Sequence, residues 1–173
     1  MTTEEVRVSQ DRIGVLIGKA GATKRGLEEK TGSRIIVDSR GRTPLSSDIL
    51  RKGPGERIIA VSGGSGEEAS ARFRGLATVI TAGEAEVDLP LLMARLRDRG
   101  ISRLMVEGGG SLVASLFTLD LVDEFSIFVG NLVIGGKDAP TPADGKGSLH
   151  ENAFVGLRLM DVTELDEGVL LRW

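Results

Sequence analysis

The sequence predicts a three-layer α/β fold, in which a mixed, mainly parallel sheet is closed by antiparallel strands. Between residues 57 and 106, β-branched runs alternate with segments of helical composition, and this order is typical of parallel β-α-β units. From residue 124 onward the pattern is rich in strands, which indicates antiparallel pairing at one side of the sheet. A length of 173 residues fits one domain, or one domain with a small subdomain.

Composition and element boundaries predict the secondary structure of the first half. Helices are expected where helical composition ends at a glycine, and buried strands where β-branched residues cluster. In chain order these elements are a strand at 6–8, a short helix at 12–18, a helix at 22–30, strands at 34–38 and 57–61, a helix at 67–76 and a strand at 77–80.

The helix that runs to residue 98 has the clearest boundaries in the second half. Asp88 is suited to the N-cap, Pro90 lies in the first turn, and Gly100 follows the end. We expect its apolar side chains Leu92, Met93 and Leu96 to face the core. The remaining elements are a strand at 103–106, a helix at 112–117, and strands at 124–133, 155–162 and 168–173.

Composition excludes several classes of site. The sequence has no cysteine, which removes disulfides, iron–sulfur clusters and cysteine nucleophiles. The single histidine, His150, lies in a polar segment where we expect it to be solvated, so neither a histidine-based metal site nor a Ser-His-Asp triad is expected. We see no signal-peptide pattern and no apolar run of about 18 residues, and we therefore expect a cytoplasmic protein.

The strongest candidate for a binding site is the run Glu-Gly-Gly-Gly-Ser-Leu at residues 107–112. It lies where a predicted strand gives way to a helix, and α/β proteins bind ligands at the carboxyl ends of such strands. Three glycines exceed what a tight turn requires, and the free N–H groups of a helix start favour a phosphate. Ser111 is suited either to the N-cap or to donating to that phosphate. The alternative is a strand-to-helix turn without a ligand.

Three other glycine-containing segments are weaker candidates. Residues 64–69 match a dinucleotide-binding pattern, with Glu84 near the expected distance, but Glu67 and Glu68 place two charges where a pyrophosphate would lie. We interpret that segment as a loop. The loop at 135–141 either closes over a substrate phosphate through Lys137 or is a surface turn.

The third segment comprises Gly18, Lys19, Ala20 and Gly21. It is one residue short of a P-loop and lacks the Ser or Thr that should follow the lysine, so we reject a P-loop. A G-x-x-G pattern between two short helices is instead typical of the KH loop, which clamps a nucleic-acid backbone. Binding of single-stranded nucleic acid through these four residues is therefore an alternative function.

From about residue 34 to residue 173 the sequence resembles the C-terminal reductase domain of riboflavin biosynthesis, especially the archaeal stand-alone pyrimidine reductases. The stretches that carry the resemblance lie at 35–45, 104–112, 121–124, 135–141 and 165–168. The resemblance implies a dihydrofolate-reductase-like fold, a homodimer, and use of NADPH to reduce a ribosylamino-pyrimidine 5′-phosphate to its ribitylamino form. It implies no metal and identifies no catalytic residue.

The same resemblance assigns the candidate site residues. Glu107 would bind the substrate, and Gly109, Gly110, Ser111 and Leu112 would bind the phosphates of the cofactor. From the residues themselves we add Gly108 of the same run to the cofactor site, and Lys137, whose charge suits a substrate phosphate, to the substrate site. The physical interpretation of the glycine run agrees with that assignment. Members of the family also carry a substrate-binding Asp-Gly-Lys-type loop and a Gly-x-Gly-Thr cofactor turn before the strand at 34–38, and we find neither here. The chain is therefore expected to be an active reductase or an inactive remnant of one.

Residues 6–38 are similar instead to an archaeal KH domain, which implies a β-α-α-β unit. The two resemblances overlap at 35–39, a strand common to both. We therefore hypothesise a chimera, natural or engineered, in which a KH-like segment at 1–38 replaces the first elements of a reductase body at 39–173 and completes its sheet within one compact domain. An inactive fold hybrid of this kind is a third alternative beside the reductase and the nucleic-acid binder.

Overall fold

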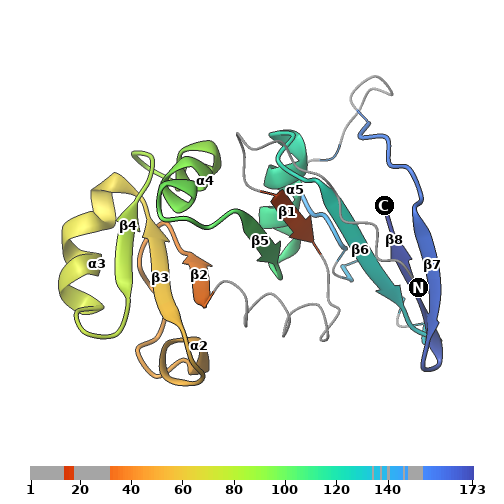
Figure 1. The fold of residues 1–173 in the computed structure, drawn as a ribbon, viewed down its shortest axis with the longest axis horizontal. Helices are drawn as coiled ribbons and strands as arrows, with labels where there is room; N and C mark the ends of the chain where they lie inside the picture. Colours follow the sequence, from red (N-terminus) through yellow and green to blue (C-terminus); the bar gives the residue numbers. More distant parts are fainter. Residues whose placement is uncertain are drawn as a thin grey trace. The chain divides into compact units, whose positions relative to one another are not determined.

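The computed structural model describes residues 14–17, 32–133, 135–136, 138–139, 141–145, 147 and 154–173. Its contacts divide the chain into two compact units (Figure 1). The three-stranded unit contains residues 32–102, and the five-stranded unit contains residues 14–17 and the described residues from 103 to 173. Each unit is described by itself.

The three-stranded unit is a parallel sheet with helical connections. Its strands β2 (Ser33–Val37), β3 (Glu56–Val61) and β4 (Thr78–Thr81) lie in the order β2-β3-β4, and both pairs are parallel. The short helix α2 (Asp48–Arg51) lies between β2 and β3 in the chain. The 3-10 turn η1 (Gly63–Ser65) and helix α3 (Gly66–Arg72) connect β3 to β4, and helix α4 (Leu89–Asp98) follows β4. The parallel β-α-β arrangement predicted from the sequence is thus confirmed for β3 and β4.

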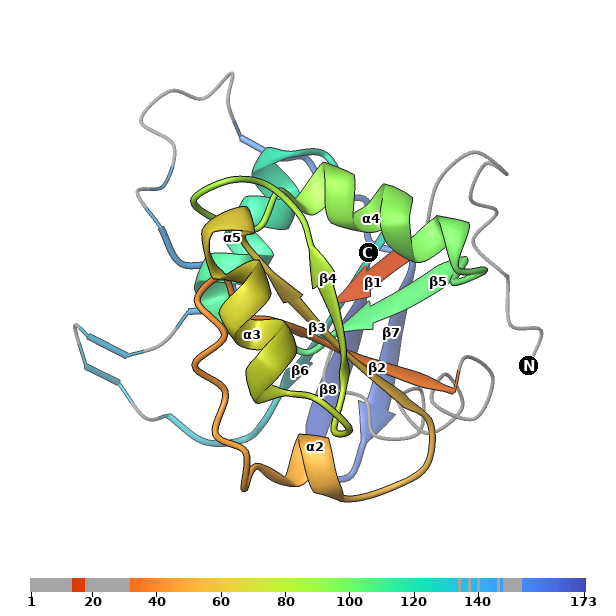
Figure 2. The ribbon, with the colours of Figure 1, turned by 90° about the vertical axis from the view of Figure 1, so that its left-hand side faces the viewer.

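The core of this unit forms around the central strand. Residues 58–61 of β3 are completely buried, as expected for a parallel strand covered on both faces. Ile59 and Val61 pack with Phe73 and Ala69 beneath α3. Figures 1 and 2 show α3 on one side of the sheet and α4 toward the other. The helix–sheet–helix layering predicted from the sequence is therefore present within this unit.

Helix α4 forms as the sequence predicts. The carboxylate of Asp88 accepts a hydrogen bond from the backbone N–H of Leu91 at 2.8 Å, which satisfies one of the unpaired donors of the first turn. Leu92 and Leu96 are fully buried on the opposite side from the charged residues. Gly100 follows the end of the helix with a φ of +82°, a conformation that glycine adopts at low cost.

The five-stranded unit has a mixed sheet with the order β5-β1-β6-β8-β7. Strand β1 (Gly14–Ile17) is parallel to both β5 (Arg103–Val106) and β6 (Glu124–Val129). Strands β7 (Asp161–Leu165) and β8 (Gly168–Arg172) form a hairpin, and β8 is antiparallel to β6. Helix α5 (Gly110–Thr118) connects β5 to β6 and buries Val113 and Leu116. The antiparallel closure predicted for the strand-rich tail is confirmed.

Aromatic contacts fix the middle of this unit. The ring of Phe125 on β6 makes an edge-to-face contact with Phe117 of α5, with 5.1 Å between ring centroids. Trp173 stacks on Phe125, with 5.8 Å between centroids. The backbone N–H of each of these two residues also donates to the carbonyl of the other, at 2.9 Å in both directions. The end of the chain is therefore tied to the centre of the sheet.

The predicted helix at 12–18 is wrong where the structure describes it, because Gly14–Ile17 is a strand. A run of four apolar residues is too short to show a period, so its pairing between β5 and β6 decides its conformation. The segment does complete a sheet, but as a strand, and it does not support a KH-like replacement. The strand predicted at 6–8 and the helix predicted at 22–30 lie outside the described residues.

The sequence predicts a single mixed sheet, and the described strands are distributed over two sheets, one in each unit. Strand β5 follows α4 in the chain, yet it pairs with β1 rather than with β4. Several boundaries differ as well: α3 ends at Arg72, α5 starts at Gly110, β6 ends at Val129, and the strand predicted at 155–162 begins at Asp161. In the part of the chain that the structure describes, no helix meets the length and apolarity needed to span a bilayer.

Candidate cofactor-binding site

The glycine run leads from β5 into α5. Strand β5 ends at Val106, Gly109 is the N-cap with an extended backbone (φ −66°, ψ 158°), and Gly110 is the first helical residue. The carbonyl of Gly109 accepts hydrogen bonds from the N–H groups of Leu112 and Val113 at 3.0 and 3.3 Å. The N–H groups of Gly110 and Ser111 donate to no acceptor among the described residues. Two neighbouring donors are thus available at the positive end of the helix dipole.

The side chains around the run leave these donors accessible. Gly108, Gly109 and Ser111 are exposed, and Leu112 is half-buried. A Cβ atom on Gly108 would lie 2.9 Å from Cδ2 of Leu112, so this leucine folds back over the glycine. Ser111 is the second helical residue and does not cap the helix, which corrects the N-cap alternative for it. Of its two suggested roles, donation to a phosphate stays a prediction.

Asp144 is the residue that sequence reasoning missed at this site. A Cβ atom on Gly110 would collide with the carboxylate of Asp144 and would lie 2.8 Å from the backbone nitrogen of Asp144. The close approach of the two chain segments therefore requires a glycine at position 110. The only signal in the sequence was the Asp-Gly pair at 144–145, which indicates a turn but not where the turn packs.

The segment 141–145, which we call the strap, holds this carboxylate in place. One oxygen of Asp144 accepts hydrogen bonds from the N–H and the hydroxyl group of Thr141, at 3.2 and 2.6 Å. The other carboxylate oxygen is the one that faces Gly110. Further along, a Cβ atom on Gly145 would be 3.7 Å from the Cβ of Ala114, so the strap also touches the second turn of α5.

A cleft opens beside the same helix. Its volume is about 1260 Å³, and it lies between α5, β6, the strap and residues 154–157. Ser111 and Ser115 of α5, together with Phe125 and Ile127 of β6, line one part of it, and the strap lines another. The glycine run therefore borders a space large enough for a small molecule.

Of the two predicted substrate residues, the structure describes Glu107 but not Lys137. Glu107 is exposed and directly follows β5, so it lies beside the run, although it is not among the residues that line the cleft. Lys137 lies outside the described residues, and so do Gly18, Lys19, Ala20, Gly21 and His150. No group of three or more acidic or histidine side chains suited to a metal ion occurs among the described residues.

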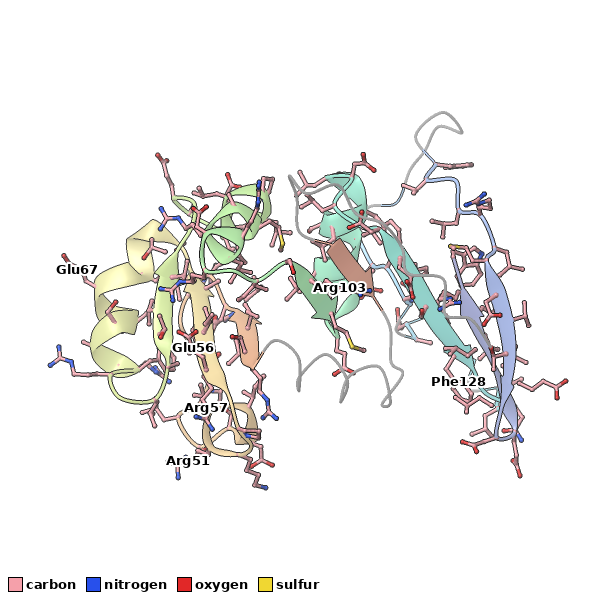
Figure 3. All side chains as sticks on the ribbon, in the orientation of Figure 1. Arg51, Glu56, Arg57, Glu67, Arg103 and Phe128 are labelled. Atoms are coloured by element: carbon pink, nitrogen blue, oxygen red, sulfur yellow. The ribbon has the colours of Figure 1, made fainter. Side chains whose placement is uncertain are left out.

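The loop interpretation of residues 64–69 is wrong about their conformation, because the 3-10 turn η1 ends at Ser65 and helix α3 begins at Gly66. The N–H groups of Gly63 and Gly64 donate to the carbonyls of Gly83 and Glu84, at 2.9 and 3.2 Å. These donors are therefore already used and cannot hold a phosphate. Glu67 projects away from the sheet on the outer side of α3 (Figure 3).

A second ordered loop follows β2, where the sequence reads Asp-Ser-Arg-Gly-Arg-Thr. Partial burial would raise the pKa of Asp38, but hydrogen bonds outweigh it and hold the pKa of this carboxyl group below its usual value of 3.8. The donors are the hydroxyl and N–H groups of Thr43, at 2.7 and 2.6 Å, and the N–H groups of Arg40 and Arg42. The charged carboxylate thus organises the loop at the carboxyl end of β2.

Fold and site together define an α/β protein with a glycine-rich strand-to-helix bend that is suited to a phosphate-bearing ligand. The chain belongs to the RibD C-terminal domain family, whose model matches residues 3–171. The resemblance to the reductase domain of riboflavin biosynthesis is therefore confirmed. The match also includes the segment assigned to a KH-like unit, so the comparison does not support that unit or a chimera.

Curated relatives of this chain include archaeal reductases. It is 38% identical over 141 residues to the 2,5-diamino-6-ribosylamino-4(3H)-pyrimidinone 5′-phosphate reductase of Archaeoglobus fulgidus, covering 82% of the chain and 62% of that protein. It is 42% identical over 140 residues to the protein of the same name from Methanothermobacter thermautotrophicus, covering 81% and 64%. The chain thus spans somewhat less than two thirds of the length of these relatives.

Solved structures show the same fold. Acinetobacter baumannii RibD matches with a TM-score of 0.61 at 17% identity, covering 95% of this chain and 58% of that one. A pyrimidine reductase-like protein from Corynebacterium diphtheriae matches with a TM-score of 0.62 at 15% identity, covering 93% and 75%. At such low identity the likeness defines the α/β fold and leaves the site residues to the geometry described above.

Proposed function

We propose that the chain is an NADPH-dependent reductase of riboflavin biosynthesis that converts a ribosylamino-pyrimidine 5′-phosphate into its ribitylamino form. The observation that carries the proposal is the pair of acceptor-free N–H groups on Gly110 and Ser111, at the end of a strand in a chain of this family. The names of the two archaeal relatives support the choice of substrate. A dinucleotide brings a pyrophosphate, which is the anion that a helix start of this kind accepts.

The chain supplies binding and orientation in this reaction. The N–H groups of Gly110 and Ser111 would bind phosphate oxygens, and Gly108 and Gly109 would let the cofactor approach the backbone. Leu112 would keep the bend in shape by packing over Gly108. The reduced nicotinamide, when bound, supplies the hydride to C1′ of the imine form of the substrate, and orientation within the cleft raises the rate of that transfer.

Two further residues are proposed to bind the substrate. Glu107 lies next to the bend, where its carboxylate could accept hydrogen bonds from substrate hydroxyl groups. Lys137 would neutralise the 5′-phosphate of the substrate from the loop at 135–141. No metal is proposed, because hydride transfer from a nicotinamide needs none. We propose a cytoplasmic location as well, where NADPH serves as a reductant.

The experiment that tests the proposal removes one amide donor and leaves the helix intact. Ser111→Pro deletes the N–H at the second position of α5. A proline is compatible with this position of a helix, as Pro90 at the second position of α4 shows. We expect about a tenfold or greater loss of NADPH affinity, measured by fluorescence titration, because a hydrogen bond to a charged group is worth about 1.5–3 kcal/mol. Ser111→Ala keeps the N–H and is the matched control. Equal NADPH affinity in both variants and the parent would contradict phosphate binding at the bend.

Turnover is tested separately. The parent chain should oxidise NADPH when the ribosylaminopyrimidine 5′-phosphate is added, and the product should carry a ribityl chain by mass spectrometry. NADPH binding without turnover would identify the chain as an inactive remnant, because the cofactor site would be present while substrate binding had failed. No binding of NADPH at millimolar concentration would refute the reductase function.

A further inference from the structure

We infer that the strap, residues 141–145, is an autoinhibitory element whose Asp144 carboxylate lies beside the position of a cofactor phosphate at the start of α5 and repels that phosphate. The inference rests on the proposed function of the glycine bend. It goes beyond that function because it assigns a regulatory role to a loop that the phosphate-binding pattern does not include.

The contact at Gly110 carries the inference. The carboxylate of Asp144 lies where a side chain of residue 110 would be, so it touches the first residue of α5 directly. The N–H groups of Gly110 and Ser111 have no acceptor in the described part of the chain, and the Asp144 oxygen that faces Gly110 accepts no hydrogen bond from that part either. The carboxylate therefore supplies negative charge at the positive end of the helix without making the hydrogen bonds that a phosphate would make.

The negative charge of the Asp144 carboxylate disfavours binding of a phosphate next to it at the start of α5. Two anions within a few ångströms of each other repel, and the first turn of one helix compensates about half an elementary charge. The carboxylate therefore repels a phosphate that binds the two N–H groups as long as the strap stays in place. Movement of the strap away from Gly110 then favours binding of the cofactor.

Few contacts hold the strap against α5. All of its five residues are exposed, so its release uncovers little apolar surface. Two hydrogen bonds within the strap, from Thr141 to Asp144, shape the turn, and the contact of Gly145 with Ala114 is an ordinary van der Waals contact at 3.7 Å. The strap also forms part of the wall of the cleft, so its displacement would widen the cleft beside α5.

The test measures NADPH affinity in variants that remove the charge or loosen the strap. Asp144→Asn keeps the shape and removes the charge, and Asp144→Ala also removes the contact with Thr141. We expect both to bind NADPH about fivefold more tightly than the parent. Thr141→Val, which deletes the hydroxyl donor, should change affinity in the same direction by a smaller factor. Glu164→Gln removes an exposed carboxylate from β7 in the same unit and should leave affinity unchanged.

The possible results separate the two proposals. Suppose that the parent and all variants bind NADPH. If neither Asp144 variant then binds NADPH more tightly than the parent, the autoinhibitory role is overturned and the cofactor site remains supported. Failure of every protein in the set to bind NADPH would remove the cofactor site and this inference together. Hydrogen exchange gives a second readout: addition of NADPH should protect the amides of Gly110 and Ser111 while exchange in the strap increases. Unchanged exchange in the strap at saturation would also overturn the inference.

Discussion

Gly110 is the single residue on which the geometry of the candidate site depends most. A Cβ atom there would meet the side chain and the backbone nitrogen of Asp144, so an alanine at this position must displace the strap. We expect Gly110→Ala to lower the free energy of unfolding by about 1 kcal/mol through this overpacking, measured by denaturant titration. Gly109→Ala is the control, because its Cβ would enter open space. Equal losses in the two variants would contradict the described contact.

Asp38 makes the stability of the loop after β2 depend on pH. Its folded pKa is lower than its unfolded pKa, so its contribution is fully present above about 3.8 and is lost as the pH falls through the folded value. We expect Asp38→Asn to cost about 1–2 kcal/mol at neutral pH and much less in acid. Asp48→Asn is the comparison, since the ion pair of Asp48 with Lys52 is exposed and should contribute less than about 1 kcal/mol. A cost of Asp38→Asn that did not vary with pH would argue against the charged network.

Residues with a local role were predictable from the sequence, and residues with a distant partner were not. The N-cap at Asp88 and the glycine bend at 108–110 depend on neighbours within four positions, so their local patterns identify them. Asp144 acts on a helix that starts 34 positions earlier in the numbering, and no local pattern encodes that contact. The sequence therefore located the glycine bend and missed the carboxylate of Asp144 beside it.

At the scale of elements, α4 offers the most direct test of a predicted boundary. Asp88→Ala removes the acceptor for the N–H of Leu91 and should destabilise the chain by about 1 kcal/mol. Asp88→Ser or Asp88→Asn should restore most of that loss, because both side chains can cap a helix. A thermal unfolding series of these three variants checks the prediction. Failure of Ser and Asn to restore stability would show that the carboxylate acts through something other than capping.

Element type followed from composition wherever a segment was long or had clear boundaries. Strand β3 and helix α4 match their predictions because each combines a strong apolar pattern with turn residues at its ends. The run Gly14–Ile17 has only four residues, and the same residues suit a short helix or a buried strand. Its position between β5 and β6 is a long-range property that periodicity does not contain.

At the scale of the whole molecule, the homodimer that the family resemblance implies would need an apolar surface, and the five-stranded sheet offers a candidate. The register places Ile127, Leu171 and Val162 side by side on one face, and the side chain of Val162 is 55% exposed at the edge. Phe128, labelled in Figure 3, is 42% exposed on the opposite face. Ile127 and Leu171 are half-buried, so Val162 is the exposed apolar end of its row, and exposed apolar surface is typical of a site that another chain covers.

We propose that a second copy of the chain covers the edge of this face around Val162, which does not line the cleft. We expect Val162→Glu to shift the protein from dimer to monomer in analytical ultracentrifugation. Thr163→Glu introduces the same charge on the next residue, whose side chain points to the other face of the same strand, and should leave the dimer intact. A dimer that survives Val162→Glu, or a parent chain that is monomeric, would contradict this interface.

The division into two sheets was not predictable from the order of elements. Parallel strands that are joined by one helix are often neighbours in the same sheet. This rule favoured pairing of β5 with β4, which α4 connects. Strand β5 instead pairs with β1, a segment about 90 residues earlier, and the four residues of β5 would suit either sheet. The fold class and the family were accessible from the sequence, whereas the choice of partner strand required the three-dimensional structure.

The central claim is that the backbone of the glycine bend binds the phosphates of NADPH. The most direct measurement follows the backbone amide resonances of the ¹⁵N-labelled chain during titration with NADPH. The account predicts saturable binding, in which the resonances of Gly110 and Ser111 shift most strongly and their amides become protected from exchange. Saturable binding that leaves these two amides unchanged, or no saturation at millimolar NADPH, would contradict it.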